Sequence, residues 1–224
     1  MEKRLVIFDL DQTLVHIPDA YDYFDGLILQ VTRHFKLPPP KQEERDKLWR
    51  IGKDYLALLS SWGFQDPHVF WPHFDLLDFA GRKQKLENEE MVLFDSVLPL
   101  LSQLRDEGYS LAILSNTIKK IVDYTLNFFE ITTFFEKIIA LGDNQVDCKP
   151  SPVGVHQIAQ ELNVPLANTV IVGDAISDIK AGNNAGIRSF LIRRRVPERF
   201  QMQLLNSELD FVLLRSLAEL PDHL

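Results

Sequence analysis

The fold is decided by Leu5-Val6-Ile7-Phe8-Asp9-Leu10-Asp11-Gln12-Thr13, close to the start of the chain. Its first four residues are a continuous run of bulky apolar side chains, which is typical of a strand buried on both faces of a parallel sheet. Residues two apart on an extended segment point the same way, so Asp9 and Asp11 are expected to converge just beyond the strand. The stretch therefore predicts a buried strand that ends in a pair of carboxylates.

Two carboxylates this close repel each other, and a divalent cation bound between them would relieve the repulsion. Hard oxygen ligands of this kind suit Mg²⁺ better than zinc. Taken alone, the pair of acids is equally compatible with an exposed turn that binds nothing.

Four further short apolar runs follow along the chain, at Leu111–Leu114, Lys137–Leu141, Thr169–Val172 and Ser189–Ile192. Amphipathic helical segments lie between them, for example around residues 97–104 and 155–162. Strands that alternate with helices predict right-handed crossovers and a parallel sheet. The expected fold class is therefore α/β.

The segment between the first two strands is different, because it contains no comparable apolar run from Asp11 to about Asp95. Prolines 38–40 and several glycines break it into three or four expected helices over about Asp19–Glu90, which carry all three tryptophans. We interpret residues 19–90 as an inserted helical domain over the C-terminal edge of the first strand, with residues 1–18 and 91–224 forming the α/β core. Extra helices packed on the flank of the sheet are the alternative.

Polar residues recur at the ends of the other predicted strands. Ser115-Asn116-Thr117 follows the second strand, Lys149-Pro150 lies in the loop after the third, and Gly173-Asp174-Ala175-Ile176-Ser177-Asp178 follows the fourth. Each has an ordinary explanation as a helix cap or a solvated loop. All of them, however, fall at the carboxyl ends of parallel strands, which is the edge of an open α/β sheet where ligands bind. Together with the first acid pair they predict one site.

The composition excludes several classes of protein. With 24 Lys and Arg against 32 Asp and Glu, the 224-residue chain carries a net charge of −8, which argues against a nucleic acid or an acidic membrane as its main partner. The single cysteine, Cys148, excludes an intramolecular disulfide. Because no apolar stretch reaches the roughly 18 residues that a membrane helix needs, we expect a cytoplasmic protein without a membrane span.

These motifs identify the chain as similar to the haloacid dehalogenase superfamily, in its phosphatase branch, and most like the phosphoglycolate-phosphatase group. The resemblance rests on residues 9–14, Ser115-Asn116, Lys149-Pro150 and residues 173–178, extended by Ala181-Gly182-Asn183-Asn184-Ala185-Gly186. It covers about residues 3–16 and 93–220. It implies a Rossmann-like parallel sheet with the strand order 3-2-1-4-5, and the helical stretch has the position and length of the family's α-helical cap.

The resemblance also implies a role for each residue of the predicted site. Asp9 would be the nucleophile that becomes an aspartyl phosphate, and Asp11 the general acid and base. Ser115 and Lys149 would bind the phosphoryl oxygens, and Lys149 would also neutralise the nucleophile, while Thr13 and Asn116 help to position that group. Mg²⁺ would be held by Asp9, the Asp11 carbonyl and Asp174, with Asp178 in support. The expected activity is Mg²⁺-dependent hydrolysis of a small phosphorylated metabolite.

Three other functions remain open from the sequence. A phosphomutase would keep Asp11 and differ mainly in excluding water from the intermediate. A dehalogenase has no use for Asp11, because a leaving halide needs no proton. A receiver-like phosphoacceptor module would lack the Asp-x-Asp pair and the helical insertion. The sequence does not give the oligomeric state.

Two departures from the family pattern do not touch the expected chemistry directly. Gln12 stands where glycine is common in the family, and Asp95-Ser96-Val97 replaces the usual Pro-Gly before the helix that leads to the second strand. Separately, Arg193-Arg194-Arg195 forms a basic cluster after the last predicted strand. A solvated loop is the simplest interpretation of that cluster; a phosphate-rich substrate or a partner is the alternative.

Overall fold

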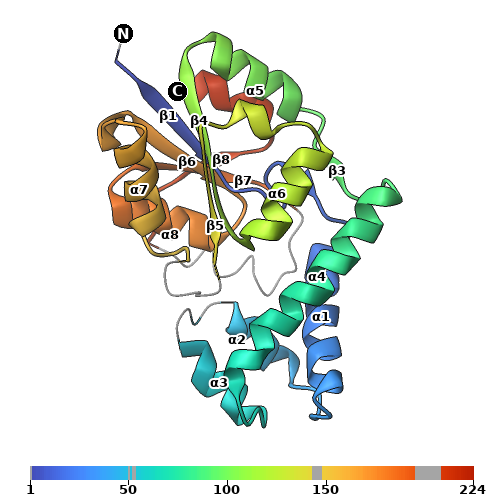
Figure 1. Ribbon diagram of the computed structural model, residues 1–224. Coiled ribbons are helices and arrows are strands. Elements are labelled where there is room, and N and C mark those ends of the chain that lie inside the picture. Colours follow the sequence, from blue (N-terminus) through green and yellow to red (C-terminus); the bar gives the residue numbers. More distant parts are fainter. Residues whose placement is uncertain (1, 50, 52–53, 143–147, 195–207) are drawn as a thin grey trace. The chain divides into compact units, whose positions relative to one another are not determined.

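The computed structural model describes the chain except for residues 1, 50, 52–53, 143–147 and 195–207, so that Arg195 of the basic cluster lies outside the described residues (Figure 1). The chain divides into two compact units. Among the described residues, one contains residues 2–16, 92–142, 148–194 and 208–224, and the other contains the described part of residues 17–91. We call the first the α/β unit and the second the helical unit. The function of the helical unit as a cap stays a prediction.

The α/β unit is built on a six-stranded parallel sheet with the order β5-β4-β1-β6-β7-β8. Its strands are β1 (Arg4–Phe8), β4 (Tyr109–Ile118), β5 (Lys137–Leu141), β6 (Thr169–Gly173), β7 (Arg188–Ile192) and β8 (Val212–Leu214). The first five correspond to the five predicted strands, and they follow the expected order 3-2-1-4-5. The strand order differs from the prediction in one detail, because β8 adds a sixth strand beside β7. The α/β fold class is confirmed.

Four helices cover the two faces of this sheet. Figure 1 shows α5 (Val97–Asp106) and α6 (Lys119–Phe128) on one face, and α7 (Val153–Glu161) and α8 (Ile176–Ala185) on the other. On the second face, Ile7 and Ile171 of the central strands pack against Val155 and Ile158 of α7 and Ala181 of α8, all of them buried. Because β1 and β6 lie in the middle of the sheet, burial on both faces explains their continuous apolar sequences. The first residues after these strands are thereby held on a rigid base.

Smaller elements complete the α/β unit. Strands β2 (Val15–His16) and β3 (Val92–Leu93) form an antiparallel pair, so the two chain segments that lead to and from the helical unit are hydrogen-bonded to each other. The 3₁₀ helices η3 (Thr132–Phe134), η5 (Leu166–Asn168) and η6 (Leu217–His223) lie in connections and at the C-terminal end.

The helical unit contains α1 (Ala20–His34), α2 (Gln42–Leu48), α3 (Tyr55–Ser61), the 3₁₀ helix η2 (Pro67–Val69) and α4 (Phe70–Glu87). These elements agree with the helices predicted over residues 19–90. They enclose a core of their own, in which Trp62 and Phe70 are buried and Trp71 packs against them, whereas Trp49 is exposed. None of the helices among the described residues is both long enough and apolar enough to cross a membrane.

One buried ion pair lies inside the helical unit. Arg82 and Asp78 are almost fully buried, and Arg82 Nε lies 2.9 Å from Asp78 Oδ1. The Tyr23 hydroxyl donates a hydrogen bond of 2.8 Å to the same oxygen. Arg82 is thus fixed inside the unit by its own partners, which explains how a guanidinium is accommodated there.

Candidate active site

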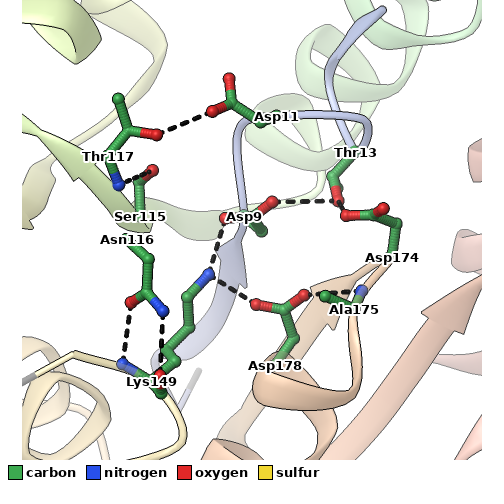
Figure 2. A network of polar contacts seen from close by, with 10 residues as sticks. All are labelled: Asp9, Asp11, Thr13, Ser115, Asn116, Thr117, Lys149, Asp174, Ala175 and Asp178. Carbon is green, nitrogen blue, oxygen red and sulfur yellow. Dashed lines mark hydrogen bonds and ion pairs between the residues drawn. The ribbon is translucent and has the colours of Figure 1, made fainter. Parts of the chain in front are cut away.

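The first acid of the predicted site, Asp9, is the residue immediately after β1. Its backbone N–H donates to the Val172 carbonyl on the neighbouring strand β6 at 2.9 Å, so the sheet fixes its main chain. Its side chain is buried, and it points toward the ends of the adjacent strands (Figure 2). The hydroxyl of Thr13, which is fully buried, lies 3.5 Å from Asp9 Oδ2 and 3.4 Å from Asp174 Oδ1.

The ammonium of Lys149 joins two of the acids. Its Nζ lies 2.6 Å from Asp9 Oδ1 and 2.5 Å from Asp178 Oδ1, and all three side chains are buried (Figure 2). The main chain of Lys149 is held as well, because its N–H donates to Asn116 Oδ1 at 2.8 Å and its carbonyl accepts from Asn116 Nδ2 at 2.9 Å. Asn116 therefore determines where the lysine leaves its loop.

The second acidic motif begins at the end of β6. Asp174 follows the strand, and Asp178 lies in the first turn of α8, where its Oδ2 accepts a hydrogen bond of 3.0 Å from the Ala175 N–H. The capping explanation for Asp178 is thus correct in part, but the other oxygen of the same carboxylate binds Lys149. Gly173 makes this possible, because any Cβ at residue 173 would overlap Asp178.

Burial and mutual repulsion raise the pKa values of two of these acids. Burial is the main reason that the pKa of Asp9 rises to about 7; Lys149 opposes the rise, whereas Asp178 and Asp11 add to it. Burial also raises the pKa of Asp174, again with contributions from Asp9 and Asp178. For Lys149 burial alone would lower the pKa, but Asp178 and Asp9 outweigh it and the pKa is raised. Lys149 therefore stays charged, but its one positive charge is too little to balance the negative charge of the surrounding acids.

The donor set fits a hard divalent cation. One carboxylate oxygen from each of Asp9, Asp174 and Asp178 lies within 4.8 Å of the other two. Three carboxylates face the buried ammonium of Lys149, and the raised pKa values of Asp9 and Asp174 indicate that it does not balance their negative charge. Oxygen ligands with excess negative charge are the kind of site that Mg²⁺ occupies. Asp11, the fourth predicted ligand, contributes no side-chain oxygen to this cluster.

Asp11 instead faces β4. Its Oδ2 accepts a hydrogen bond of 2.7 Å from the Thr117 hydroxyl (Figure 2). Ser115, two residues earlier on β4, is buried, and its Oγ accepts from the Thr117 N–H at 3.1 Å. Helix α6 starts only at Lys119, so Ser115-Asn116-Thr117 does not cap it. These polar side chains are free of a capping role and lie beside the acids.

The eight predicted site residues are therefore neighbours in the α/β unit: Asp9, Asp11, Thr13, Ser115, Asn116, Lys149, Asp174 and Asp178. Two further residues hold them. Thr117 was part of the predicted polar cluster but had no role of its own; its hydroxyl donates to Asp11, and its position two residues after Ser115 on a strand was a signal for a shared direction. Arg194, which was assigned to a solvated loop, is half-buried and binds the carbonyls of Gln12 and Thr13.

Known proteins resemble this chain over most of its length. A family model described as haloacid dehalogenase-like hydrolase matches residues 6–192, a range that contains all eight site residues. The phosphoglycolate phosphatase of Psychrobacter arcticus is 28% identical over 192 residues, which are 84% of this chain and 82% of that protein. The pyrophosphatase PpaX of Halalkalibacterium halodurans is 26% identical over 225 residues, with 99% of this chain and 97% of that protein covered.

The fold has solved counterparts. The crystal structure of CbbY from Rhodobacter sphaeroides in complex with phosphate superposes with a TM-score of 0.72 and 22% sequence identity, covering 97% of this chain and 96% of that chain. At this level of identity the likeness concerns the fold, which both chains share over nearly their whole length.

Proposed function

The chain belongs to the haloacid dehalogenase-like hydrolase family, and from this premise we propose that it is a Mg²⁺-dependent phosphatase. Its substrate would be a small phosphorylated metabolite of the cytoplasm, and Asp9 would carry the phosphoryl group between two half-reactions. The similarity to a phosphoglycolate phosphatase and to a pyrophosphatase supports this type of chemistry.

One observation carries the proposal: a buried carboxylate, Asp9, is held 2.6 Å from a buried ammonium and lies beside a second acid that another residue orients. Phosphoryl transfer requires alignment and neutralisation of charge more than any other assistance. Lys149 supplies fixed positive charge next to Asp9, and Thr117 holds Asp11 away from the three-carboxylate cluster. The two acids are therefore equipped for different tasks.

In the first half-reaction a carboxylate oxygen of Asp9 attacks phosphorus while the bond from phosphorus to the leaving oxygen breaks. Asp11, protonated at this stage, gives its proton to the leaving oxygen, so that an alcohol departs. The product on the protein is an acyl phosphate at Asp9. Splitting hydrolysis at a covalent intermediate replaces one difficult step by two easier ones.

In the second half-reaction Asp11, now a carboxylate, takes a proton from water as the water oxygen attacks phosphorus. The bond between phosphorus and Asp9 breaks, inorganic phosphate leaves, and Asp9 is again a carboxylate. The protein thereby returns to its first state with the proton back on Asp11. Its hydrogen bond from Thr117 keeps the Asp11 carboxyl group in one orientation through both steps.

Asp9, Asp174 and Asp178 are the side chains that would hold the cation. When bound, Mg²⁺ would supply positive charge against the carboxylates and the phosphoryl oxygens. Lys149 and the Ser115 hydroxyl are the groups of this chain that would bind those oxygens. Asn116 would contribute through the Lys149 main chain that it holds, and Thr13 through its hydroxyl between Asp9 and Asp174.

The test is hydrolysis of 4-nitrophenyl phosphate by the full chain with Mg²⁺ and with a chelator. We expect turnover that chelation abolishes, and loss of turnover in Asp9→Asn, because an amide oxygen is a poor nucleophile. Asp106→Asn, the same change on the exposed face of α5, is the matched control. Ordinary turnover by folded Asp9→Asn would show that Asp9 is not the nucleophile.

A second comparison tests the role of Asp11. Asp11→Asn should slow hydrolysis of an alkyl phosphate more than that of 4-nitrophenyl phosphate, because nitrophenolate leaves without a proton. Equal rates of wild type and variant with the alkyl phosphate would remove Asp11 from acid and base catalysis.

A further inference from the structure

The loop after Asp9 contains a residue in an unfavourable backbone conformation. Gln12 has a φ of 58°, in the left-handed region that favours glycine, because a side chain there approaches the following carbonyl. This residue lies between Asp11 and Thr13, so its backbone angles set how these two residues are placed relative to each other. Its N–H donates to the Val15 carbonyl at 2.7 Å, which closes the loop.

Arg194 binds this loop from the far end of the sequence. Its Nε donates to the Gln12 carbonyl at 2.6 Å, and its Nη2 donates to the Thr13 carbonyl at 3.0 Å. Two adjacent donors of one planar guanidinium thus bind two successive carbonyls. Because the guanidinium is held in place by a separate support, the Phe94 ring, both carbonyls reach it only when the chain turns at Gln12 as it does here.

Arg194 is itself fixed on the same loop. The carbon at the centre of its guanidinium, Cζ, lies 3.6 Å from the centre of the Phe94 ring, in contact with its face. The Phe94 N–H donates to the Leu14 carbonyl at 3.1 Å. The aromatic support and the two accepting carbonyls therefore belong to one hydrogen-bonded assembly around residues 12–14.

We propose that Arg194 is a positioning residue for phosphoryl transfer, which clamps Gln12 in the left-handed conformation and so holds Asp11 and Thr13 on either side of Asp9. This inference rests on the proposed function, because it assigns Arg194 a task in that reaction. It differs from the interpretation of the basic cluster as a solvated loop or a docking surface, because the charged end of Arg194 is turned inward to backbone carbonyls.

The adjacent arginine provides a matched control. The Arg193 side chain is exposed, and its recorded hydrogen bond within the described part of the chain is made by its backbone N–H, to the Leu214 carbonyl at 2.7 Å. Arg193→Met therefore removes the same charge from the same segment without touching the loop. We expect its kcat and KM to equal those of the wild type.

The experiment is a double-mutant cycle with Arg194→Met and Gln12→Gly, measured with 4-nitrophenyl phosphate and excess Mg²⁺. Arg194→Met should lower kcat by about 10- to 100-fold and change KM by less than about threefold, since the loop positions a group rather than binding substrate. Glycine adopts the left-handed conformation without the clamp, so in the Gln12→Gly background the loss caused by Arg194→Met should shrink at least about threefold. An equal loss in both backgrounds would overturn the proposal.

Arg194→Lys separates geometry from charge. It keeps a positive charge near Asp174 but replaces the planar fork by a single nitrogen, which cannot occupy the positions of both nitrogens that Arg194 uses. We expect it to retain less than about one fifth of the wild-type kcat. Wild-type kcat in this variant would show that charge alone suffices, and would also overturn the proposal.

A second readout separates failure of this inference from failure of the proposed function. If the wild-type protein hydrolyses no phosphate ester, the four proteins of the cycle (the wild type, Arg194→Met, Gln12→Gly and the double variant) are compared by urea unfolding. Coupling of at least about fivefold in the unfolding equilibrium constant between the two positions supports the clamp, and additive effects refute it.

Discussion

Replacing Gly173 by Ala tests whether the acid cluster depends on the close approach of β6 and α8. A Cβ on residue 173 would lie closer than 3.0 Å to Cγ, Oδ2 and Cβ of Asp178. Ordinary contact between carbon atoms is about 3.5–4.0 Å, so Asp178 would have to move by about 1 Å. Rotation of its side chain gives no relief, because the overlap includes its own Cβ.

Neither partner can move without breaking other contacts. Gly173 pairs with Leu191 at the end of β6, so a shift of its backbone disturbs the sheet. Displacement of Asp178 breaks its 2.5 Å contact with Lys149 and its hydrogen bond from the Ala175 N–H. Overpacking costs about 1–3 kcal/mol, and a buried charge that loses a partner adds to it. We expect Gly173→Ala to lose about 2–4 kcal/mol of unfolding free energy.

The effect on activity should exceed the effect on folding. Displacement by about 1 Å in a catalytic site reduces turnover by about 100-fold, so we expect kcat per folded molecule to fall by that factor. The control is Gly182→Ala in α8, whose Cβ would overlap Ser189 and Ile171 in the core. It should lower stability and keep kcat per folded molecule. Wild-type kcat and stability in Gly173→Ala, or equal kcat losses in both variants, would refute the reasoning.

Three further predictions address charge, acid orientation and the helical unit. Because burial raises the pKa of Asp9 to about 7, the folded protein keeps a proton that the unfolded chain loses near pH 4, so stability without metal should fall as pH rises between these values. Thermal unfolding in chelator at pH 5 and pH 8 measures this loss of stability. Added Mg²⁺ should raise the melting temperature more at pH 8 than at pH 5, and equal increases at both pH values would contradict the prediction. Thr117→Val removes the hydroxyl that orients the proposed general acid and should lower kcat by about tenfold for alkyl phosphates; an unchanged rate would show that the contact has no catalytic role. Asp78→Ala leaves the buried Arg82 without its carboxylate and should lower the free energy of unfolding in urea by about 3 kcal/mol. Lys83→Ala, which removes one partner of an exposed ion pair, should lower it by less than about 1 kcal/mol. Equal losses in the two variants would contradict this prediction.

The sheet could be predicted because its central strands are buried on both faces. Residues 5–8 and 170–172 have no polar position, and that pattern has few explanations besides a covered parallel strand. Strand β8 could not be predicted in this way. It has three residues at the edge of the sheet, and its place beside β7 depends on pairing that no local pattern encodes.

The candidate site was predictable to the extent that its residues stand at strand ends. Its supporting contacts were not, since they join residues far apart in the sequence. Asn116 illustrates this limit: it was expected to position the phosphoryl group, and its side chain makes two hydrogen bonds to the Lys149 main chain, 33 residues away. Arg194 lies 182 residues after Gln12, and three consecutive arginines normally indicate a solvated segment. Only the folded chain relates them.

The acid cluster lowers the stability of the fold but would serve the proposed function. The Lys149 ammonium contacts Asp9 and Asp178. The contact to Asp174 within the described part of the chain is longer, 3.4 Å from the Thr13 hydroxyl. Burial raises the pKa of Asp174, and repulsion from Asp9 and Asp178 raises it further. Lys149 and Arg194 offset this rise only in part. A fold selected for stability alone would replace one of these acids with a neutral side chain. The uncompensated negative charge is instead what would give the end of this sheet an affinity for the proposed cation, and the well-packed central strands on which the cluster stands make that imbalance tolerable.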